Sequence, residues 1–113
     1  MDCIFCKIIG GQIPGNFVYQ DETVVAFRDI NPVAPVHILI APREHIGSLA
    51  DITEERAGLV GHMAVVANQI ARQMGIAENG YRVTINNGPE GGQVVPHLHM
   101  HLLGGRQLSG RLG

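Results

Sequence analysis

The sequence of 113 residues contains no tryptophan, and aromatic residues make up only 4% of it. Large rings therefore cannot supply most of the core, which must be built from Val, Ile, Leu, Ala and Met. Apolar residues account for 45% of the chain, a content typical of a globular protein and not of a disordered one. A chain of this length suits one domain, and we assign residues 1–113 to it.

The chain also lacks runs of basic residues and long apolar runs. Its formal net charge is −2 with neutral histidines. Duplex nucleic acid is bound through many cationic contacts, so a nucleic acid polymer is not an expected partner. No segment approaches the ~18 apolar residues of a membrane span, and the N-terminus does not resemble a signal peptide. We therefore expect a cytoplasmic protein with no membrane partner.

Cysteine is scarce too, because Cys3 and Cys6 are the only two in the chain. In a reducing compartment both would remain thiols. Their Cys-x-x-Cys spacing is open to a metal-binding pair, a redox pair, or two free cysteines in a helical turn. The redox interpretation is disfavoured because no thioredoxin-like βαβ pattern follows.

The order of the expected elements indicates an α+β protein. The first nine residues favour a short helical turn, and β-branched or alternating stretches predict strands over 17–20, 23–29, 36–41, 81–86 and 97–103. A helix should begin near Thr53, a suitable N-cap, and end at Gly75. Its apolar stripe is predicted to comprise Val60, Met63, Ala64, Ala67, Ile70, Ala71 and Met74. We predict a five-stranded antiparallel sheet with one long helix packed on it and a short N-terminal helical turn.

Three of the six histidines alternate with apolar residues in the stretch PHLHMHLLGG, residues 96–105. On a strand, His97, His99 and His101 would share one face, and the core would take Leu98, Met100 and Leu102. By the same alternation His37 on the strand 36–41 would point to the histidine side. His62 lies across the helix from the apolar stripe, and we expect it to be a plain surface residue.

The alternating histidines allow three interpretations. They could lie by chance on a half-exposed strand, they could chelate a metal ion, or they could act as nucleophile, base and hydrogen-bond donor. A glycine-rich loop precedes them. Gly88, Gly91 and Gly92 allow positive φ, and consecutive amides in such a loop can form an anion site. The loop favours chemistry in which a phosphate is delivered to an imidazole.

At this point the sequence resembles the histidine triad superfamily. HLHMHLL fits its His-x-His-x-His-x-x motif, with GGQ before it and LLGGR after it. Three further stretches match, in order, the nucleotide-binding branch that hydrolyses purine nucleoside phosphoramidates: CIFCKIIGGQIP, VVAFRDINPVAPVHILIAPREHI and GYRVTINNGPEGGQ. The resemblance covers essentially the whole chain. It implies the fold predicted above and a homodimer made by joining two sheets.

The resemblance implies a role for each triad position. His99 would be the nucleophile that attacks the α-phosphorus, giving a nucleotidyl-histidine that water then cleaves. His101 would donate to the phosphate oxygens, and His37 would be a supporting fourth histidine. The residues that match phosphate contacts in the family are Asn86, Gly92 and Gln93.

Further substrate contacts follow from the same resemblance. Asp29 matches a carboxylate that binds the ribose hydroxyls, although an aspartate before Ile-Asn-Pro is also a good turn residue. The apolar walls of the purine pocket would be Ile13, Phe27, Ile30 and Leu39, each equally credible as plain core. Val94 stands where many members carry a hydroxyl residue. The tail RQLSGRLG lacks an aromatic residue that some members place near the partner subunit's site, so leaving-group preference is the property these departures affect.

Members with the Cys-x-x-Cys pair resemble a zinc-binding subset of the superfamily. The resemblance implies that the zinc ligands are Cys3, Cys6, His45 and His97. Two cysteines and two histidines make a complete tetrahedral structural site with no open position. Zinc would then hold the N-terminal turn and would not be required for the chemistry.

The sequence thus predicts a hydrolase of purine nucleoside phosphoramidates. One alternative is a nucleotide-binding regulatory or scaffold module with incidental hydrolysis. Another is a dinucleoside polyphosphate hydrolase, which would be expected to lack LGGR after the triad. A nucleotidylyltransferase is disfavoured because that branch carries glutamine where this chain keeps His101.

Overall fold

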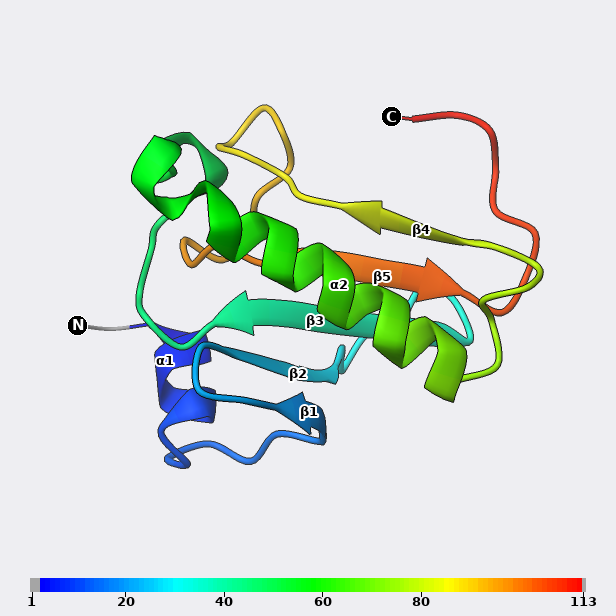
Figure 1. Ribbon diagram of the computed structural model, residues 1–113, viewed down its shortest axis with the longest axis horizontal. Coiled ribbons are helices and arrows are strands. Elements are labelled where there is room, and N and C mark those ends of the chain that lie inside the picture. Colours follow the sequence, from blue (N-terminus) through cyan, green and yellow to red (C-terminus); the bar gives the residue numbers. More distant parts are fainter. Residues whose placement is uncertain (1–2, 113) are drawn as a thin grey trace.

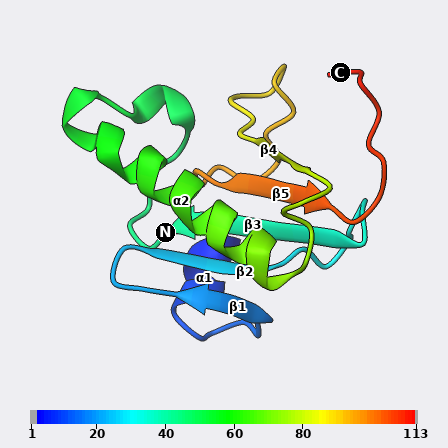
Figure 2. The ribbon, with the colours of Figure 1, turned by 45° about the vertical axis from the view of Figure 1, so that its right-hand side comes forward.

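A computed structural model describes residues 3–112 as a five-stranded antiparallel sheet in the order β1-β2-β3-β5-β4. The long helix α2 crosses one face of the sheet, and the short helix α1 lies against the other (Figures 1 and 2). This arrangement confirms the predicted α+β class. The elements are α1 (Ile4–Ile9), β1 (Phe17–Gln20), β2 (Val24–Arg28), β3 (Val36–Pro42), α2 (Ala57–Gln73), β4 (Tyr81–Thr84) and β5 (Met100–Gly104).

The central strands are buried on both faces of the sheet. In β2, Val24 packs in the cluster under α2, whereas the next residue, Val25, belongs to the cluster on the α1 side. In β3, Ile38 and Leu39 divide in the same way, because successive side chains of a strand point to opposite faces. The second cluster includes Phe5 of α1. The N-terminal helix therefore closes the face of the sheet on which the histidines were expected.

The helix α2 begins later than the sequence indicated. Two 3₁₀ turns, Leu49–Asp51 and Glu54–Arg56, precede its first residue, Ala57. Thr53 sits at the N-cap of the second turn, but its side chain makes no capping hydrogen bond. The segment that leads into α2 therefore consists of two 3₁₀ turns, and α2 does not begin directly after an N-cap at Thr53. Among residues 3–112, no helix has the length and apolar character needed to cross a membrane.

The helix ends where predicted, because Gly75 adopts a φ of 74° and its N–H bonds the carbonyl of Arg72. The buried residues of α2 are Met63, Val66, Ala67, Ile70 and Ala71. Val66 was missing from the predicted stripe, although it lies three residues from Met63 and four from Ile70 on the same face. The outer members of that stripe, Val60, Ala64 and Met74, are only half-buried.

The last strand differs most from the expectation, because β5 begins at Met100 and not at residue 97. Its partner β3 ends at Pro42, which has no N–H to continue the ladder toward Leu98. Leu98 instead donates its N–H to the carbonyl of Ile46. The apolar alternation is nevertheless confirmed, since Leu98, Met100 and Leu102 are all buried in the cluster under α2.

Candidate active site and metal-ligand cluster

The buried His99 side chain has one defined hydrogen-bonding edge. Its Nδ1 lies 2.7 Å from the backbone carbonyl oxygen of His97. A carbonyl can only accept, so Nδ1 carries the hydrogen and the neutral ring keeps its lone pair on Nε2. A neutral imidazole with a bare Nε2 is competent as a nucleophile. The backbone next to His99 thereby selects the tautomer that covalent catalysis needs.

The imidazoles of His37 and His101 meet at 2.9 Å, from Nε2 to Nδ1. The Val33 N–H donates to Nδ1 of His37 at 3.2 Å, so His37 carries its hydrogen on Nε2 and donates to His101. His101 must then be protonated on its outer nitrogen, Nε2. The register of the sheet builds this pair, because β3 and β5 are adjacent antiparallel strands.

Burial keeps both of these histidines neutral. Burial, followed by the neighbouring His99 and His37, lowers the pKa of His101 to about 4. Burial also lowers the pKa of His37, and the Asp29 carboxylate opposes part of that effect. At neutral pH the pair therefore offers a polarised N–H donor and not a fixed positive charge.

Asp29 serves the turn and also reaches the histidines. Its Oδ1 accepts the N–H of Asn31 at 2.8 Å, which is the turn role open to an aspartate at this position. Its Oδ2 lies 3.4 Å from Nε2 of His37. The carboxylate is therefore held beside the His37–His101 pair.

Asp29, His37 and His101 bring three potential metal ligands together. The facing nitrogens of the two histidines are 2.9 Å apart, whereas their ring centroids are 5.2 Å apart. The centroid separation exceeds the nitrogen separation by about the sum of the two ring radii. The two nitrogens therefore lie nearly on the line between the ring centres, and the imidazoles point straight at each other. Lone pairs aimed along one line do not converge on an ion. We therefore interpret the group as a hydrogen-bonded relay and not as a metal site.

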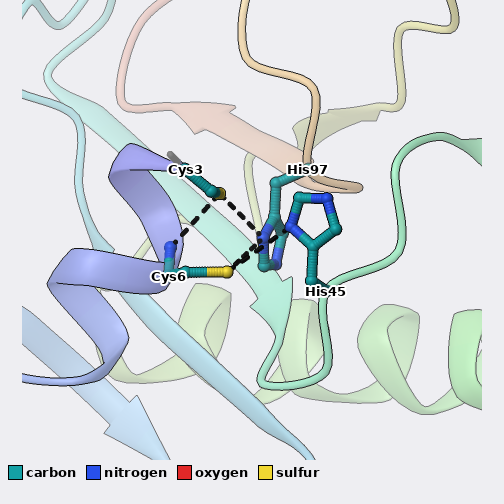
Figure 3. Close-up of side chains that lie close together, drawn as sticks. All are labelled: Cys3, Cys6, His45 and His97. Atoms are coloured by element: carbon teal, nitrogen blue, oxygen red, sulfur yellow. Dashed lines mark hydrogen bonds between the residues drawn. The ribbon is translucent and has the colours of Figure 1, made fainter. Parts of the chain in front are cut away.

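A second cluster joins Cys3, Cys6, His45 and His97, and their ligand atoms all lie within 4.8 Å of one another. Figure 3 shows the side chains of Cys3 and Cys6 at the start of α1, facing the imidazoles of His45 and His97. Nδ1 of His97 is 3.4 Å from Sγ of Cys3 and 3.6 Å from Sγ of Cys6, and Nδ1 of His45 is 3.4 Å from Sγ of Cys6. Tetrahedral zinc bonds imply a sulfur–nitrogen separation of about 3.6 Å.

The protonation pattern of this cluster also suits a cation. Nε2 of His97 lies 2.9 Å from the carbonyl oxygen of Pro42, so Nε2 carries the hydrogen and Nδ1 turns a bare lone pair to the sulfurs. Burial, and then the adjacent Cys3, raise the pKa of the Cys6 thiol. A bound cation would reverse that effect by favouring thiolate. The donor set and its spacing therefore fit the zinc ion that the resemblance implies.

The residues expected to line the base pocket differ in how deeply they are buried. Phe27 and Leu39 are buried in the cluster on the α1 side, as their core interpretation predicts. Ile30, by contrast, is 90% exposed, and Val94 is 89% exposed. Ile13 and Val94 border a hollow of about 310 Å³, lined by Cys3, Ile4, Lys7, Ile13, Val94, Val95 and Pro96.

The glycine-rich loop has the expected backbone freedom at two positions. Gly88 and Gly92 adopt φ values of 74° and 82°, whereas Gly91 is required for space because a Cβ there would meet the carbonyl of Asn87. The amides of Gly92 and Gln93 already donate to carbonyls within the loop. These amides would have to change partners in order to bind a phosphate.

The side chain of Gln93 is engaged as well. Its Nε2 donates to the carbonyls of Gly47 and Val95 at 2.8 and 3.0 Å, and its Oε1 accepts the N–H of Gly88 at 2.9 Å. Gln93 thus holds the loop in shape, and a phosphate contact from its amide requires one of these bonds to break. The side-chain nitrogen of Asn86, the other expected phosphate contact, lies next to Gly92.

His62 lies at the surface as expected, with 39% of its side chain exposed, but it makes a contact that the sequence did not predict. Its Nε2 lies 2.7 Å from Oδ2 of Asp21, which ties α2 to the β1–β2 turn. Burial of Asp21 raises the pKa of its carboxyl group. Hydrogen bonds to the carboxylate, the largest effect coming from the Val24 N–H, outweigh burial and hold that pKa well below its usual range. Tyr19 also donates to this carboxylate. The pattern of α2 could not reveal the contact, because Asp21 is 41 residues away.

Known proteins match this chain over nearly its whole length. Residues 10–108 match the HIT domain family. The chain belongs to that family.

Three relatives span most of their own length and of this chain. Purine nucleoside phosphoramidase of Escherichia coli K12 is 53% identical over 107 residues, covering 95% of this chain and 90% of the relative. A 14 kDa zinc-binding protein of Zea mays is 53% identical over 108 residues, with 94% and 84% covered. The crystal structure of a HIT family hydrolase from Legionella pneumophila Philadelphia 1 superposes with a TM-score of 0.96 at 43% identity and covers 99% of this chain and 100% of that one.

Proposed function

We propose that this protein hydrolyses purine nucleoside phosphoramidates through a nucleotidyl intermediate on His99. The observation that carries the proposal is the hydrogen bond from Nδ1 of His99 to the His97 carbonyl, which leaves Nε2 free to attack. The similarity to a purine nucleoside phosphoramidase supports the substrate class.

The reaction proceeds in two displacements at phosphorus. Nε2 of His99 forms a bond to the α-phosphorus, and the P–N bond to the amine breaks as the amine takes up a proton from solvent. Water then attacks the same phosphorus, releases a proton to solvent and displaces His99 as neutral imidazole. The products are a nucleoside monophosphate and a free amine, and the imidazole is regenerated. Splitting the displacement in this way replaces one difficult step by two easier ones.

The neighbouring histidines would stabilise charge in both steps. His101 carries its hydrogen on the nitrogen that does not face His37, so it can donate to a phosphate oxygen as negative charge develops. His37 keeps His101 in that tautomer. Asp29, beside the pair, would accept hydrogen bonds from the ribose hydroxyls. The remaining proposed substrate contacts are Asn86, Gly92, Gln93 and Val94 toward the phosphate and Ile13, Phe27, Ile30 and Leu39 toward the base.

We further propose that Cys3, Cys6, His45 and His97 hold one structural zinc ion. Such an ion supplies a cross-link and takes no part in the displacement, because four protein ligands leave it no open position. The similarity to a zinc-binding protein of Zea mays supports the identity of the metal. The site would fasten α1 to the segment that carries His99. Cytoplasmic thiols would remain reduced and available as ligands.

A homodimer is the proposed assembly. The outer strand β4 has an unpaired edge, because it pairs only with β5 among the strands of residues 3–112. Val65 on α2 and Val83 on β4 are 49% and 43% exposed. A second copy would cover these apolar side chains and extend the sheet. Light scattering at micromolar concentration should give the mass of two chains, and a monomer mass would refute the assembly.

Substrate comparison tests the proposed activity. Adenosine 5′-phosphoramidate should be turned over far faster than diadenosine polyphosphates. The reverse order would indicate a dinucleoside polyphosphate hydrolase. Tight binding of adenosine monophosphate without measurable turnover of either compound would indicate a binding module.

A further inference from the structure

Phe5 on α1 packs directly against the proposed nucleophile. Its ring centroid lies 5.0 Å from that of His99, and the two planes are 83° apart, an edge-to-face contact. Phe5 is itself buried, with 6% of its surface exposed. A buried ring can hold its neighbour in one orientation, because neither of the two has space to turn.

The ring of His99 is contacted from several directions. The His97 carbonyl holds Nδ1 at 2.7 Å, and the ring of His101 lies 5.0 Å away at an angle of 60°. Phe5 adds an edge-to-face contact with the same ring. Without Phe5, the hydrogen bond to His97 and the His101 ring would remain, but the edge-to-face contact that opposes rotation of the imidazole would be lost.

Phe5 is placed by the Cys-x-x-Cys turn and by a second ring. It lies between Cys3 and Cys6, both members of the proposed metal cluster. On the sheet, the ring of Phe27 meets it at 5.4 Å and 80°. The turn and the sheet therefore fix the position of Phe5, and Phe5 in turn contacts His99.

We propose that Phe5 is a positioning residue, which transmits the rigidity of the Cys-x-x-Cys turn to His99 and keeps its Nε2 aimed at the substrate. This inference goes beyond the proposed function. It rests on that function only where turnover is measured, because the orientation of the His99 ring can be measured without substrate. It assigns to the N-terminal turn a role in nucleophile orientation in addition to fold stability.

The test replaces Phe5 by leucine, which keeps an apolar side chain and removes the ring. The first readout is the tautomer of His99, measured by nitrogen-15 NMR of labelled imidazoles in the unliganded protein. Wild-type His99 should be held as the Nδ1–H form, and Phe5→Leu should populate both tautomers. The second readout is turnover of adenosine 5′-phosphoramidate. Here kcat should fall about fivefold to tenfold while KM stays within about twofold.

Phe17→Leu is the matched control, because Phe17 packs on Phe27 at 6.0 Å and has no ring contact with His99. It should leave both the tautomer and kcat unchanged. Phe5→Met removes the ring with less change in volume and gives the same readouts if Phe5→Leu does not fold. Zinc content measured on every variant shows whether the turn itself is intact.

Two outcomes would overturn the inference. One is a His99 tautomer in both Phe5 variants that is identical to that of the wild type. The other is a rise in KM alone, which would make Phe5 a substrate contact and not a positioning residue. If wild-type protein does not turn over the phosphoramidate, the proposed function fails, and the NMR comparison still decides the role of Phe5.

Discussion

The carbonyl of His97 accepts the Nδ1–H of His99 at 2.7 Å, while the imidazole of His97 faces the sulfurs of Cys3 and Cys6. One residue therefore belongs to the metal-ligand cluster through its side chain and to the proposed active site through its backbone. Any change that moves His97 should therefore also move His99, the proposed nucleophile. The two sites use different atoms of His97, the imidazole and the backbone carbonyl, so a shift of this residue changes both.

His99→Ala should lower turnover of adenosine 5′-phosphoramidate by about 10³-fold or more, because the proposed nucleophile is lost. Nucleotide binding should remain close to that of the wild type, since the contacts to the base and ribose are kept. Steady-state kinetics and calorimetric titration with adenosine monophosphate measure the two effects. His62→Ala, on the far side of the sheet, is the matched histidine control and should retain activity. A His99→Ala protein with near wild-type turnover would exclude the covalent mechanism.

Purified protein should contain about one zinc ion per chain, and Cys6→Ser should bind it much more weakly. Removing the ion with a chelator should loosen α1, since the ligands come from its first turn. Elemental analysis and thiol titration give the stoichiometry and the ligand state. Metal-free protein with both thiols freely reactive after gentle purification would contradict the site.

Val94→Thr or Val94→Ser should speed release of poor amine leaving groups by roughly fivefold. The added hydroxyl can donate one hydrogen bond, worth about 1 kcal/mol, as the P–N bond breaks. Val94 is 89% exposed, so the substitution should not disturb packing. Single-turnover rates across a series of amines measure the effect, and good leaving groups should barely respond. Equal rates for every amine would show that position 94 does not contribute.

Asp21→Ala should reduce the free energy of unfolding by about 2–3 kcal/mol, because several donors lose their shared acceptor. The carboxylate accepts the N–H groups of Thr23 and Val24, the hydroxyl of Tyr19, and the ring of His62. His62→Ala removes only one half-exposed partner and should cost about 0.5–1 kcal/mol. Urea unfolding of the two variants gives the comparison. Equal losses would show that the His62 contact dominates the group.

Stability should fall as pH decreases from about 6.5 toward 4, because of His101. The folded protein holds the pKa of His101 at about 4 through burial and the neighbouring His99 and His37, whereas the unfolded chain has a pKa near its ordinary value of about 6.5. Between these values the unfolded chain binds a proton that the folded chain does not, so acid favours unfolding. Above about pH 6.5 the contribution is constant. Urea midpoints should decline less steeply in His101→Gln, and parallel curves for the two proteins would refute the assignment.

Much of the fold was readable because it follows from local patterns. The alternation of β-branched residues located every strand to within a few residues, and Gly75 marked the end of α2. The triad stretch could be read for its apolar face, since Leu98, Met100 and Leu102 are buried as alternation requires. The start of β5 was predicted three residues too early. It depends on the partner strand β3, which ends at Pro42, a residue without an N–H group.

The sequence by itself determined which residue types are available: a row of imidazoles, a pair of thiols three positions apart, and a glycine-rich loop. Only the tertiary structure decided which groups each of them contacts. It brings His37 to His101 across 64 positions and Cys3 to His97 across 94, pairs His62 with Asp21, and uses the Gln93 amide to hold its own loop. Propensity and periodicity act over a few residues. Tautomers, metal-ligand geometry and carboxylate contacts depend on distances of a few ångströms between segments that only the packing of α1, α2 and the sheet brings together.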